Sequence, residues 1–430
     1  MAGHFPDRQA IRQFQLEQLQ KLLDLVQGAN RFYQQKLEHP NAGFSLTSLS
    51  NFSDCIPFTT KQEVVADQQA FPPFGSNHSY PIDHYTRCHQ TSGTGGGAPL
   101  RWLDTAQSWR WMVQTWQQIH GAAGVTAADR VFFAFSFGPF LGFWLAFEAA
   151  EKIGCLCLSG GGLSTIARLS GILDQQATVL CCTPSYAIRL AEVAAAEKVD
   201  LPQRSKIRLI LVAGEPGGSV PATRNRIEQL WPGARVSDHH GMTEIGPVTL
   251  ECPKQPGVLH VIEQSFFPEI IDPISSHPVS PGQRGELVLT NLGRLGSPLL
   301  RYRTGDMVQA IPQAKCGCGR SDLALEGGIL ARVDDMVVVR GVNVYPTSVE
   351  EIVRSFSEIV EYQVSISKAG ALSEITVHIE PEPDCKDSAE LAARLQKSFE
   401  KSLSLRVPVQ IAPVGSLPRF EMKARRWVRQ

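Results

Sequence analysis

The chain carries Arg301-Tyr302-Arg303-Thr304-Gly305-Asp306 and, further on, Ala331-Arg332-Val333-Asp334-Asp335-Met336-Val337. The first stretch places an acid directly after a glycine turn, and the second places a charged cluster in front of an apolar strand. Charged side chains are seldom buried for stability alone. Two such clusters therefore indicate a polar ligand that carries hydroxyl or phosphate groups.

Length and composition bound the class of protein. A chain of 430 residues exceeds one hydrophobic core, so we expect at least two domains. The content of 43% hydrophobic and 19% charged residues is typical of a globular protein, and the net charge of −1 favours neither nucleic acid nor an anionic membrane as partner. The N-terminal residues do not resemble a signal peptide, and we find no apolar run of about eighteen residues, so we expect a cytoplasmic protein without a membrane span. Ten cysteines are then expected to be reduced thiols, some of them in a metal site.

The N-terminal hundred residues predict a helix followed by loops. Apolar residues recur at helical spacing over 10–37, which predicts an amphipathic helix. The next fifty residues are interrupted by prolines, and we expect them to form surface loops.

The middle of the chain alternates strands and helices. Buried strands are predicted at 131–135, 178–182 and 207–212, and helices at 185–198 and 220–231. This alternation is typical of an α/β domain with a largely parallel sheet. Shorter strands within 284–311 predict a small β subdomain.

The pattern restarts after Asp335. We expect a strand at 336–340, a helix near 347–357, strands at 361–367 and 374–380, and a helix at 388–403. The predicted fold class is therefore α/β, with a large N-terminal α/β domain of several subdomains (1–332) and a small mobile α+β C-terminal domain (333–430).

Two polar motifs lie in the predicted N-terminal domain. Thr91-Ser92-Gly93-Thr94-Gly95-Gly96-Gly97-Ala98-Pro99 combines glycines, which let N–H groups converge on an anion, with hydroxyls that donate to phosphate. A flexible surface loop would have the same composition. Asp238-His239-His240-Gly241-Met242-Thr243-Glu244 combines imidazole rings suited to stacking on a purine with a glutamate suited to Mg²⁺. Histidines with a purely structural role are the alternative.

These motifs resemble those of the adenylate-forming superfamily of acyl-CoA synthetases. The resemblance rests on TSGTGGGAP, AGEP at 213–216, DHHGMTE, YRTGD, ARVDDMVVVRGVNVYP and the lysine in PRFEMKARR, in order from roughly 90 to 426. Within the superfamily, RGVNVYPTSVEEI, TPSY at 183–186, EIID at 269–272 and CGCGR at 316–320 are most similar to the phenylacetate–CoA ligase family. The resemblance implies ATP, Mg²⁺ and CoA as cofactors or co-substrates, and it implies a homodimer.

The resemblance also implies a role for each matching residue. Thr243 would contact the α-phosphate, Glu244 would hold Mg²⁺, and Lys423 would stabilise charge as the acid attacks the α-phosphate. Asp334 would be the hinge of the C-terminal domain. The nucleotide-binding residues would be Ser92, Gly93 and Thr94 on the phosphates, Gly214, Glu215, Pro216, Asp238, His240, Gly241 and Met242 around adenine, and Asp306 and Arg332 on the ribose.

The chain departs from the family pattern at several positions, among them Phe137, which replaces a frequent tyrosine of the acid pocket. Gly97 stands where the phosphate loop usually has lysine, and His240 stands where adenine usually stacks on tyrosine. Ala331 and Met422 replace the glycines that usually precede the hinge arginine and the terminal lysine. We interpret these differences as changes that do not abolish the activity, because imidazole still stacks on adenine and the loop lysine is dispensable.

Cys252, His260, Cys316 and Cys318 supply the number and kind of ligands that a structural tetrahedral Zn²⁺ site needs. Their spacing is not that of a standard zinc finger, but some members of the family bind zinc at matching positions. Reduced buried cysteines beside a glycine turn are the alternative.

The segment 135–144 aligns with the acid pocket of the family. Phe137, Phe140 and Phe143, flanked by Ala213 and Gly214, would form a wall against an aromatic ring. Ordinary core packing fits these side chains equally well.

The sequence thus predicts an AMP-forming ligase that joins an arylacetate or benzoate-type acid to CoA. Delivery of the acyl group to a carrier-protein thiol or another acceptor is the first alternative. A catalytically silent adenylate-binding regulatory protein is the second, and the presence of Glu244, Asp306, Arg332 and Lys423 argues against it.

Overall fold

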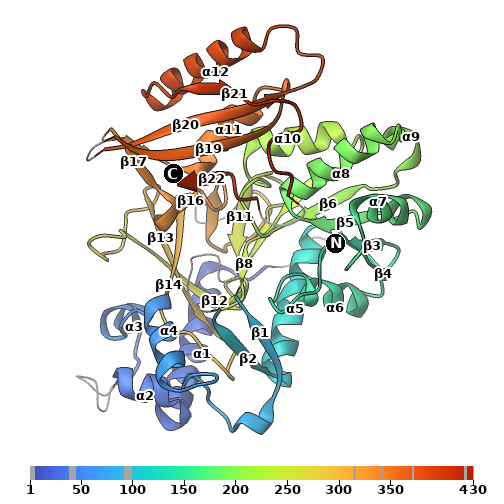
Figure 1. Ribbon diagram of the computed structural model, residues 1–430. Helices are drawn as coiled ribbons and strands as arrows, with labels where there is room; N and C mark the ends of the chain where they lie inside the picture. The colour runs from blue at the N-terminus through green and yellow to red at the C-terminus, as the bar shows by residue number, and fades with distance from the viewer. Residues whose placement is uncertain are drawn as a thin grey trace. The chain divides into compact units, whose positions relative to one another are not determined.

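The computed structural model in Figure 1 describes residues 5–37, 45–91, 99–312, 316–340, 342–369, 372–420 and 424–429. Ser92, Gly93, Thr94 and Lys423 lie outside the described residues. The chain divides into two compact units. The first unit contains Met1–Val131, Ser136–Cys157 and His239–Gly328; the second contains Phe132–Phe135, Leu158–Asp238 and Ile329–Gln430.

The first unit begins with helices that the sequence predicted only in part. The apolar repeat over 10–37 forms two helices, α1 (Arg8–Ala29) and α2 (Arg31–Leu37), because Asn30 between them is extended and donates from Nδ2 to Asn77 Oδ1 at 3.0 Å. The prediction of loops alone after residue 37 is wrong. The segment contains α3 (Leu49–Cys55) and α4 (Lys61–Ala70), and α4 begins with a reciprocal capping box between Thr60 and Glu63.

Among the described residues, the first unit also contains the 3₁₀ helix Ile82–His84 and the helices α5 (Ala106–Ala122) and α6 (Trp144–Ile153). Helix α5 was not among the predicted elements. It buries Trp109, Met112 and Trp116 on one face. Met112 packs closely against Gly246, since its Sδ would lie 3.1 Å from a Cβ added at that glycine. The strands around it lie in several small antiparallel sheets: β1 (Tyr85–Gln90) with β2 (Arg101–Thr105), β8 (Gly241–Met242) with β9 (Gly246–Pro247), β10 (Thr249–Glu251) with β11 (Val258–Val261) and β15 (Ala324–Glu326), and β12 (Phe266–Ile271) with β13 (Arg284–Asn291) and β14 (Tyr302–Gln309).

The second unit contains the predicted parallel sheet, in the order β4-β3-β5-β6-β7. Its strands are β5 (Val179–Cys182), β6 (Leu209–Val212) and β7 (Arg235–Asp238), joined by the last residues of β3 (Arg130–Phe133) and β4 (Leu156–Ser159). Strands β5 to β7 run parallel, and β5 and β6 are fully buried, which explains the unbroken apolar sequence of these two strands. The helices are α7 (Thr165–Asp174), α8 (Pro184–Ala196), α9 (Leu201–Arg204) and α10 (Pro221–Leu230), and α8 and α10 confirm two predicted helices.

The C-terminal part of the second unit is an α+β layer. Its sheet has the order β18-β17-β20-β19-β22, and β21 pairs with β20. The strands are β17 (Val337–Val339), β18 (Val342–Val344), β19 (Ile359–Ala369), β20 (Leu372–Pro381), β21 (Val409–Ile411) and β22 (Trp427–Arg429), and the helices are α11 (Pro346–Arg354) and α12 (Ser388–Leu403). Figure 1 shows α12 and this sheet in orange and red. Val353, Leu395, Phe399 and Val377 form its buried core.

The fold class predicted from the sequence is confirmed. None of the described helices is long and apolar enough to cross a membrane. The predicted domain boundary at 332/333 falls within the segment β16 (Ala331–Arg332) to the 3₁₀ turn Val333–Asp335, and it stays a prediction.

Candidate active site

Asp306 is the acid of the YRTGD motif, and its side chain is buried. It lies on β14 directly after Gly305, whose φ of 74° favours glycine, and only 2% of its surface is exposed. Its Oδ2 lies 3.2 Å from Nε2 of His240, and its N–H donates to Thr304 Oγ1 at 3.0 Å. The structure therefore places one residue that the sequence assigned to the ribose beside one that it assigned to adenine.

The two arginines of the same motif are used within the fold. Arg301 forms a bidentate pair with Glu269 at 2.9 and 3.0 Å, and its guanidinium lies 4.0 Å from the centre of the Phe58 ring. Arg303 pairs with Glu286. The expectation that the charges of this motif face a ligand therefore does not hold for these arginines, which join β14 and the residue before it to β12 and β13.

His240 and Gly241 occupy a tight turn of backbone. The carbonyl of His240 accepts from the N–H groups of Val248 and Thr249, and the N–H of His240 donates to Thr249 Oγ1 at 2.8 Å. A Cβ on Gly241 would lie 2.8 Å from the carbonyl oxygen of Gly246, so only glycine fits this pairing of β8 and β9. Met242 pairs with Gly246 in the same hairpin.

His239 is a structural histidine. Its Nδ1 lies 3.0 Å from the carbonyl oxygen of Thr249, and its ring packs 4.4 Å from that of Trp116. Burial lowers its pKa to about 3, so the ring is neutral near pH 7.

Thr243 and Glu244 are held by a buried ion pair that sequence reasoning missed. Arg294 donates from Nη1 to the carbonyls of Thr243 at 2.7 Å and Glu244 at 3.0 Å, and two further nitrogens bind Asp104 at 2.7 Å each. The side chains of Arg294 and Asp104 are both fully buried. We call Asp104, Arg294 and the Thr243–Glu244 backbone the Arg294 anchor. No local sequence pattern joins Asp104 to Arg294.

Glu244 carries the carboxylate that the sequence assigned to Mg²⁺. It is 6% exposed, and its Oε1 lies 3.4 Å from Nζ of Lys61 on α4. A single carboxylate suits Mg²⁺ when phosphate oxygens and water supply the other ligands, so the residue fits the ion.

The second unit carries the AGEP motif at the carboxyl end of β6, where open parallel sheets bind ligands. Gly214 follows Ala213 with φ of 96°, a conformation that favours glycine. At the end of the neighbouring β7, Asp238 Oδ2 accepts from the Ser219 hydroxyl at 2.5 Å.

Glu215 uses both carboxylate oxygens on backbone N–H groups. Oε1 accepts from Ser185 N at 2.8 Å, and Oε2 accepts from Ala424 N at 2.6 Å. Pro216 follows it directly. The residue next to the predicted catalytic lysine is thus bonded to the AGEP motif.

Arg332 lies just before the predicted hinge residue, Asp334. Arg332 ends β16 and is partly buried, whereas Asp334 is exposed in the following 3₁₀ turn. A short exposed turn between two strands suits a hinge.

Cys252, His260, Cys316 and Cys318 converge in the first unit, with all four ligand atoms within 4.8 Å of one another. Cys252 Sγ lies 3.6 Å from Cys316 Sγ, and Cys318 Sγ lies 3.5 Å from His260 Nε2. Tetrahedral Zn²⁺ with its usual bond lengths requires separations of about 3.8 and about 3.6 Å.

The histidine of this cluster is oriented for a metal. His260 Nδ1 lies 3.4 Å from the carbonyl oxygen of Asp322, a contact that favours a proton on Nδ1 and leaves Nε2 facing the thiols. The four residues therefore fit a structural zinc ion.

The three predicted pocket phenylalanines have different surroundings. Phe143 is 3% exposed and packs 6.2 Å from Trp116, as a core residue would. Phe137 is half-buried and meets Trp144 and Phe147 edge-on at 4.9 and 5.6 Å. Phe140 is also half-buried and lies against Gly138.

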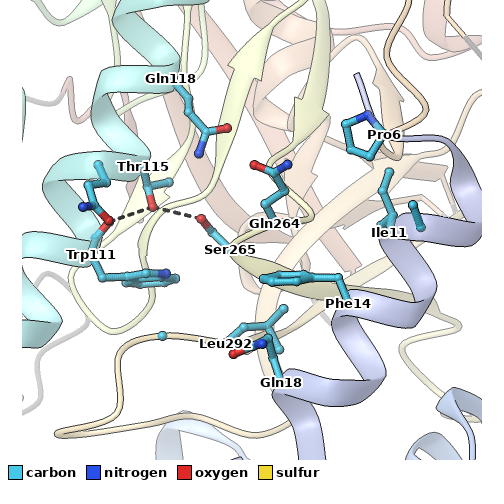
Figure 2. A pocket seen from close by; sticks show the side chains of 13 residues that line it. Pro6, Ile11, Phe14, Gln18, Trp111, Thr115, Gln118, Gln264, Ser265 and Leu292 are labelled. Carbon is cyan, nitrogen blue, oxygen red and sulfur yellow. Dashed lines mark hydrogen bonds between the residues drawn. The ribbon is translucent and has the colours of Figure 1, made fainter. Parts of the chain in front are cut away.

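The larger of the two cavities described lies elsewhere in the first unit. It has a volume of about 550 Å³ and lies between α1 and α5. Phe14 of α1, Trp111 of α5 and Leu292 line it (Figure 2). The hydroxyls of Thr115 and Ser265 are hydrogen-bonded to each other at 2.9 Å at its wall. None of the residues that line it is charged.

Comparisons with known proteins identify the family. Residues 91–293 match the AMP-binding enzyme family, and residues 341–430 match the AMP-binding enzyme C-terminal domain. The chain is 31% identical to a phenylacetate–coenzyme A ligase of Pseudomonas putida, over 96% of this chain and 93% of that protein. The chain belongs to the phenylacetate–CoA ligase family.

Two further comparisons extend the likeness of this ligase-family chain. A phenylacetate–coenzyme A ligase of Thermus thermophilus is 30% identical over 96% of this chain and 95% of its own length. The crystal structure of a 2-hydroxyisobutyryl-CoA ligase in its postadenylation state is 27% identical, with a TM-score of 0.92 over 99% of this chain and 91% of that one. The resemblance stated from the motifs is confirmed.

Proposed function

We propose that this chain is an AMP-forming acid–CoA ligase that acts on an aromatic acid of the arylacetate or benzoate type. The observation that carries the proposal is the likeness to phenylacetate–CoA ligases over nearly the whole chain. The contact between the buried Asp306 and His240, two residues with predicted nucleotide roles, supports it.

The proposed reaction has two steps. In the first, a carboxylate oxygen of the acid bonds to the α-phosphorus of ATP, and the bond to pyrophosphate breaks. In the second, the CoA thiol attacks the acyl carbon, AMP leaves and the thiol proton is released. The protein has to position the groups and neutralise charge, and no nucleophilic side chain is needed.

Each candidate residue has a role in this scheme. Asp306 and Arg332 bind the ribose hydroxyls, and Thr243 contacts the α-phosphate from a backbone that the Arg294 anchor holds in place. Lys423 stabilises the charge on the α-phosphate, and Asp334 is the hinge that lets the C-terminal domain exchange its groups between the steps. Adenine binding is assigned to Gly214, Glu215, Pro216, Asp238, His240, Gly241 and Met242, and phosphate binding to Ser92, Gly93 and Thr94.

Mg²⁺ on Glu244 would neutralise charge on the phosphates of ATP. The cluster of Cys252, His260, Cys316 and Cys318 would hold one structural Zn²⁺, because all four positions of a tetrahedron are filled by the protein. This zinc would tie the turn at 316–318 to β11, away from any step of the reaction.

The aromatic acid is proposed from the names of the relatives and from the aromatic segment. Phe137 is the strongest candidate of the three phenylalanines because it is half-buried among Trp144 and Phe147, whereas Phe143 packs in the core. A carrier-protein thiol in place of CoA remains the second acceptor to test, and a homodimer is expected from the family.

Acid-dependent release of pyrophosphate tests the proposal. We would measure it with ATP and Mg²⁺ across benzoates, arylacetates and aliphatic acids, including 2-hydroxyisobutyrate, with and without CoA. Release with an aryl acid that CoA accelerates is expected. Release with aliphatic acids alone would contradict the aromatic assignment, release that CoA does not affect would indicate another acceptor, and silence across the panel would contradict the ligase.

A further inference from the structure

The segment that follows Lys423 is tied at several points to α8 and the AGEP motif of the second unit. Ala424 N donates to Glu215 Oε2 at 2.6 Å, and Arg426 Nη2 donates to the Ser185 hydroxyl at 3.1 Å. Before the lysine, Arg419 Nε lies 3.7 Å from Glu192 Oε2 on α8. We call this set the C-terminal clamp, and its members are Ser185, Glu192, Glu215, Arg419, Ala424 and Arg426.

Glu215 is the centre of the clamp. Its two oxygens bridge the first turn of α8, through Ser185 N at 2.8 Å, and the backbone one residue after Lys423. An anionic side chain is favoured at the N-terminus of a helix, and bonds from N–H groups to a carboxylate are stronger than neutral ones. The carboxylate is therefore committed to positioning backbone.

The two arginines of the clamp are anchored on the other side by the C-terminal sheet. Arg426 is 7% exposed and binds Glu361 at 2.7 and 3.1 Å. Arg419 binds Glu380 through two nitrogen contacts of 2.5 and 3.1 Å. Arg419 and Arg426 thus each contact α8 on one side and the C-terminal sheet on the other.

We propose that Glu215 is a positioning residue that holds the Lys423 segment in place for adenylation and releases it for thioester formation. The inference rests on the proposed function and deepens it: Glu215 stays part of the adenine-binding stretch, and its carboxylate acts on the segment that carries the lysine. The bond to Ala424 N lasts only as long as the C-terminal segment stays against the AGEP motif. Its stabilisation therefore belongs to one half-reaction.

The test separates the two half-reactions in full-length protein. Glu215→Gln retains one carbonyl oxygen but turns an NH₂ group toward the other N–H, so one of the two bonds is lost. Single-turnover adenylate formation without CoA should slow roughly 10- to 100-fold, the effect of losing a charge-assisted bond. The rate at which CoA converts supplied acyl-adenylate to thioester should stay within about twofold of the wild-type rate. Glu197→Gln, at the exposed C-terminal end of α8, is the matched control and should change neither rate.

Tryptic cleavage, which does not depend on enzyme activity, separates the role proposed for Glu215 from the proposed ligase function. Trypsin cleaves after Lys423 and Arg425, so the substrate-free Glu215→Gln protein should be cut there faster than the wild type or Glu197→Gln. An equal fall in both half-reactions would assign Glu215 to the capping of α8 alone, and unchanged adenylation or cleavage would also overturn the inference. Wild-type protein that forms no adenylate would contradict the proposed function, and the cleavage rates would then still decide whether the clamp exists.

Discussion

The Arg294 anchor of the first unit and the C-terminal clamp of the second unit both position groups assigned to adenylation, but with different permanence. The anchor is an ion pair with both side chains fully buried, whereas Arg419 and Glu192 of the clamp expose 22% and 23% of their side chains. Breaking a buried pair leaves an unpaired charge, while a partly exposed pair is replaced by water at low cost. On our proposal, the anchor holds Thr243 and Glu244 through both steps, and the clamp holds its residues through one.

Arg294→Ala should have the largest effect, because it leaves Asp104 buried without its partner. We expect unfolding free energy to fall by about 3–5 kcal/mol and both half-reactions to be lost together. Urea unfolding and the two single-turnover assays would measure this. Arg394→Ala, which breaks an exposed pair with Glu358, should cost under about 1 kcal/mol, and an equal loss in the two variants would remove the distinction between fixed and releasable contacts.

Lys423→Ala tests the other side of the comparison. Removing one group that stabilises transition-state charge should slow adenylation about 10²–10³-fold, with thioester formation from supplied acyl-adenylate and the unfolding free energy nearly unchanged. Rapid-quench assays of each half-reaction would show the split. A variant with full adenylation would show that the role given to Lys423 is wrong.

Zinc removal should affect the first unit without touching the clamp. Cys252→Ser is expected to lower bound zinc from about one equivalent per chain to near zero and to lower the melting temperature. Burial raises the pKa of the Cys252 thiol to about 12, so binding of the metal must release its proton and should weaken as the pH falls. Elemental analysis and calorimetry would measure both effects, and Cys88→Ser, at an exposed position, is the control. Wild-type protein purified without metal and indifferent to added zinc would contradict the site.

Protonation of Glu361, which binds Arg426 of the clamp, should lower the unfolding free energy modestly in acid. Burial opposes ionisation of Glu361, but Arg354 and Arg426 outweigh it and hold its pKa below the usual range. Such a carboxylate contributes stability above its unfolded pKa of about 4.3, and this contribution is lost as the pH falls through the lower folded pKa. Unfolding free energy measured from pH 7 to pH 3 should therefore fall less steeply in Glu361→Gln than in the wild type, and parallel curves would contradict the coupling.

Much of the fold was predictable because it depends on local periodicity. The unbroken apolar runs of β5 and β6 and the helical spacing of α8 and α12 predicted those elements closely. The errors arose where one residue decides the outcome. Asn30 divides a continuous apolar repeat into α1 and α2, and the capping box at Thr60 starts α4 in a segment rich in proline.

The candidate site was predictable as a set of motifs but not as a set of contacts. Asp306 and His240 were each assigned to the nucleotide, and their proximity follows from neither motif alone. Arg294 binds Asp104 from 190 residues away, and Glu215 binds Ala424 from 209 residues away, so only the folded chain brings these pairs together. Roles that depend on such long-range hydrogen bonds leave no periodic or spacing signal in the sequence.

The most direct test of the account follows one oxygen atom. Phenylacetate labelled with ¹⁸O in its carboxylate would be incubated with ATP, Mg²⁺, CoA and the wild-type protein, and the nucleotide product analysed by mass spectrometry. The account predicts AMP that carries one ¹⁸O, because the acid oxygen bonds to the α-phosphorus and stays there when the thiol attacks the acyl carbon. Phenylacetyl-CoA formed with unlabelled AMP, or with ¹⁸O in inorganic phosphate beside ADP, would contradict it.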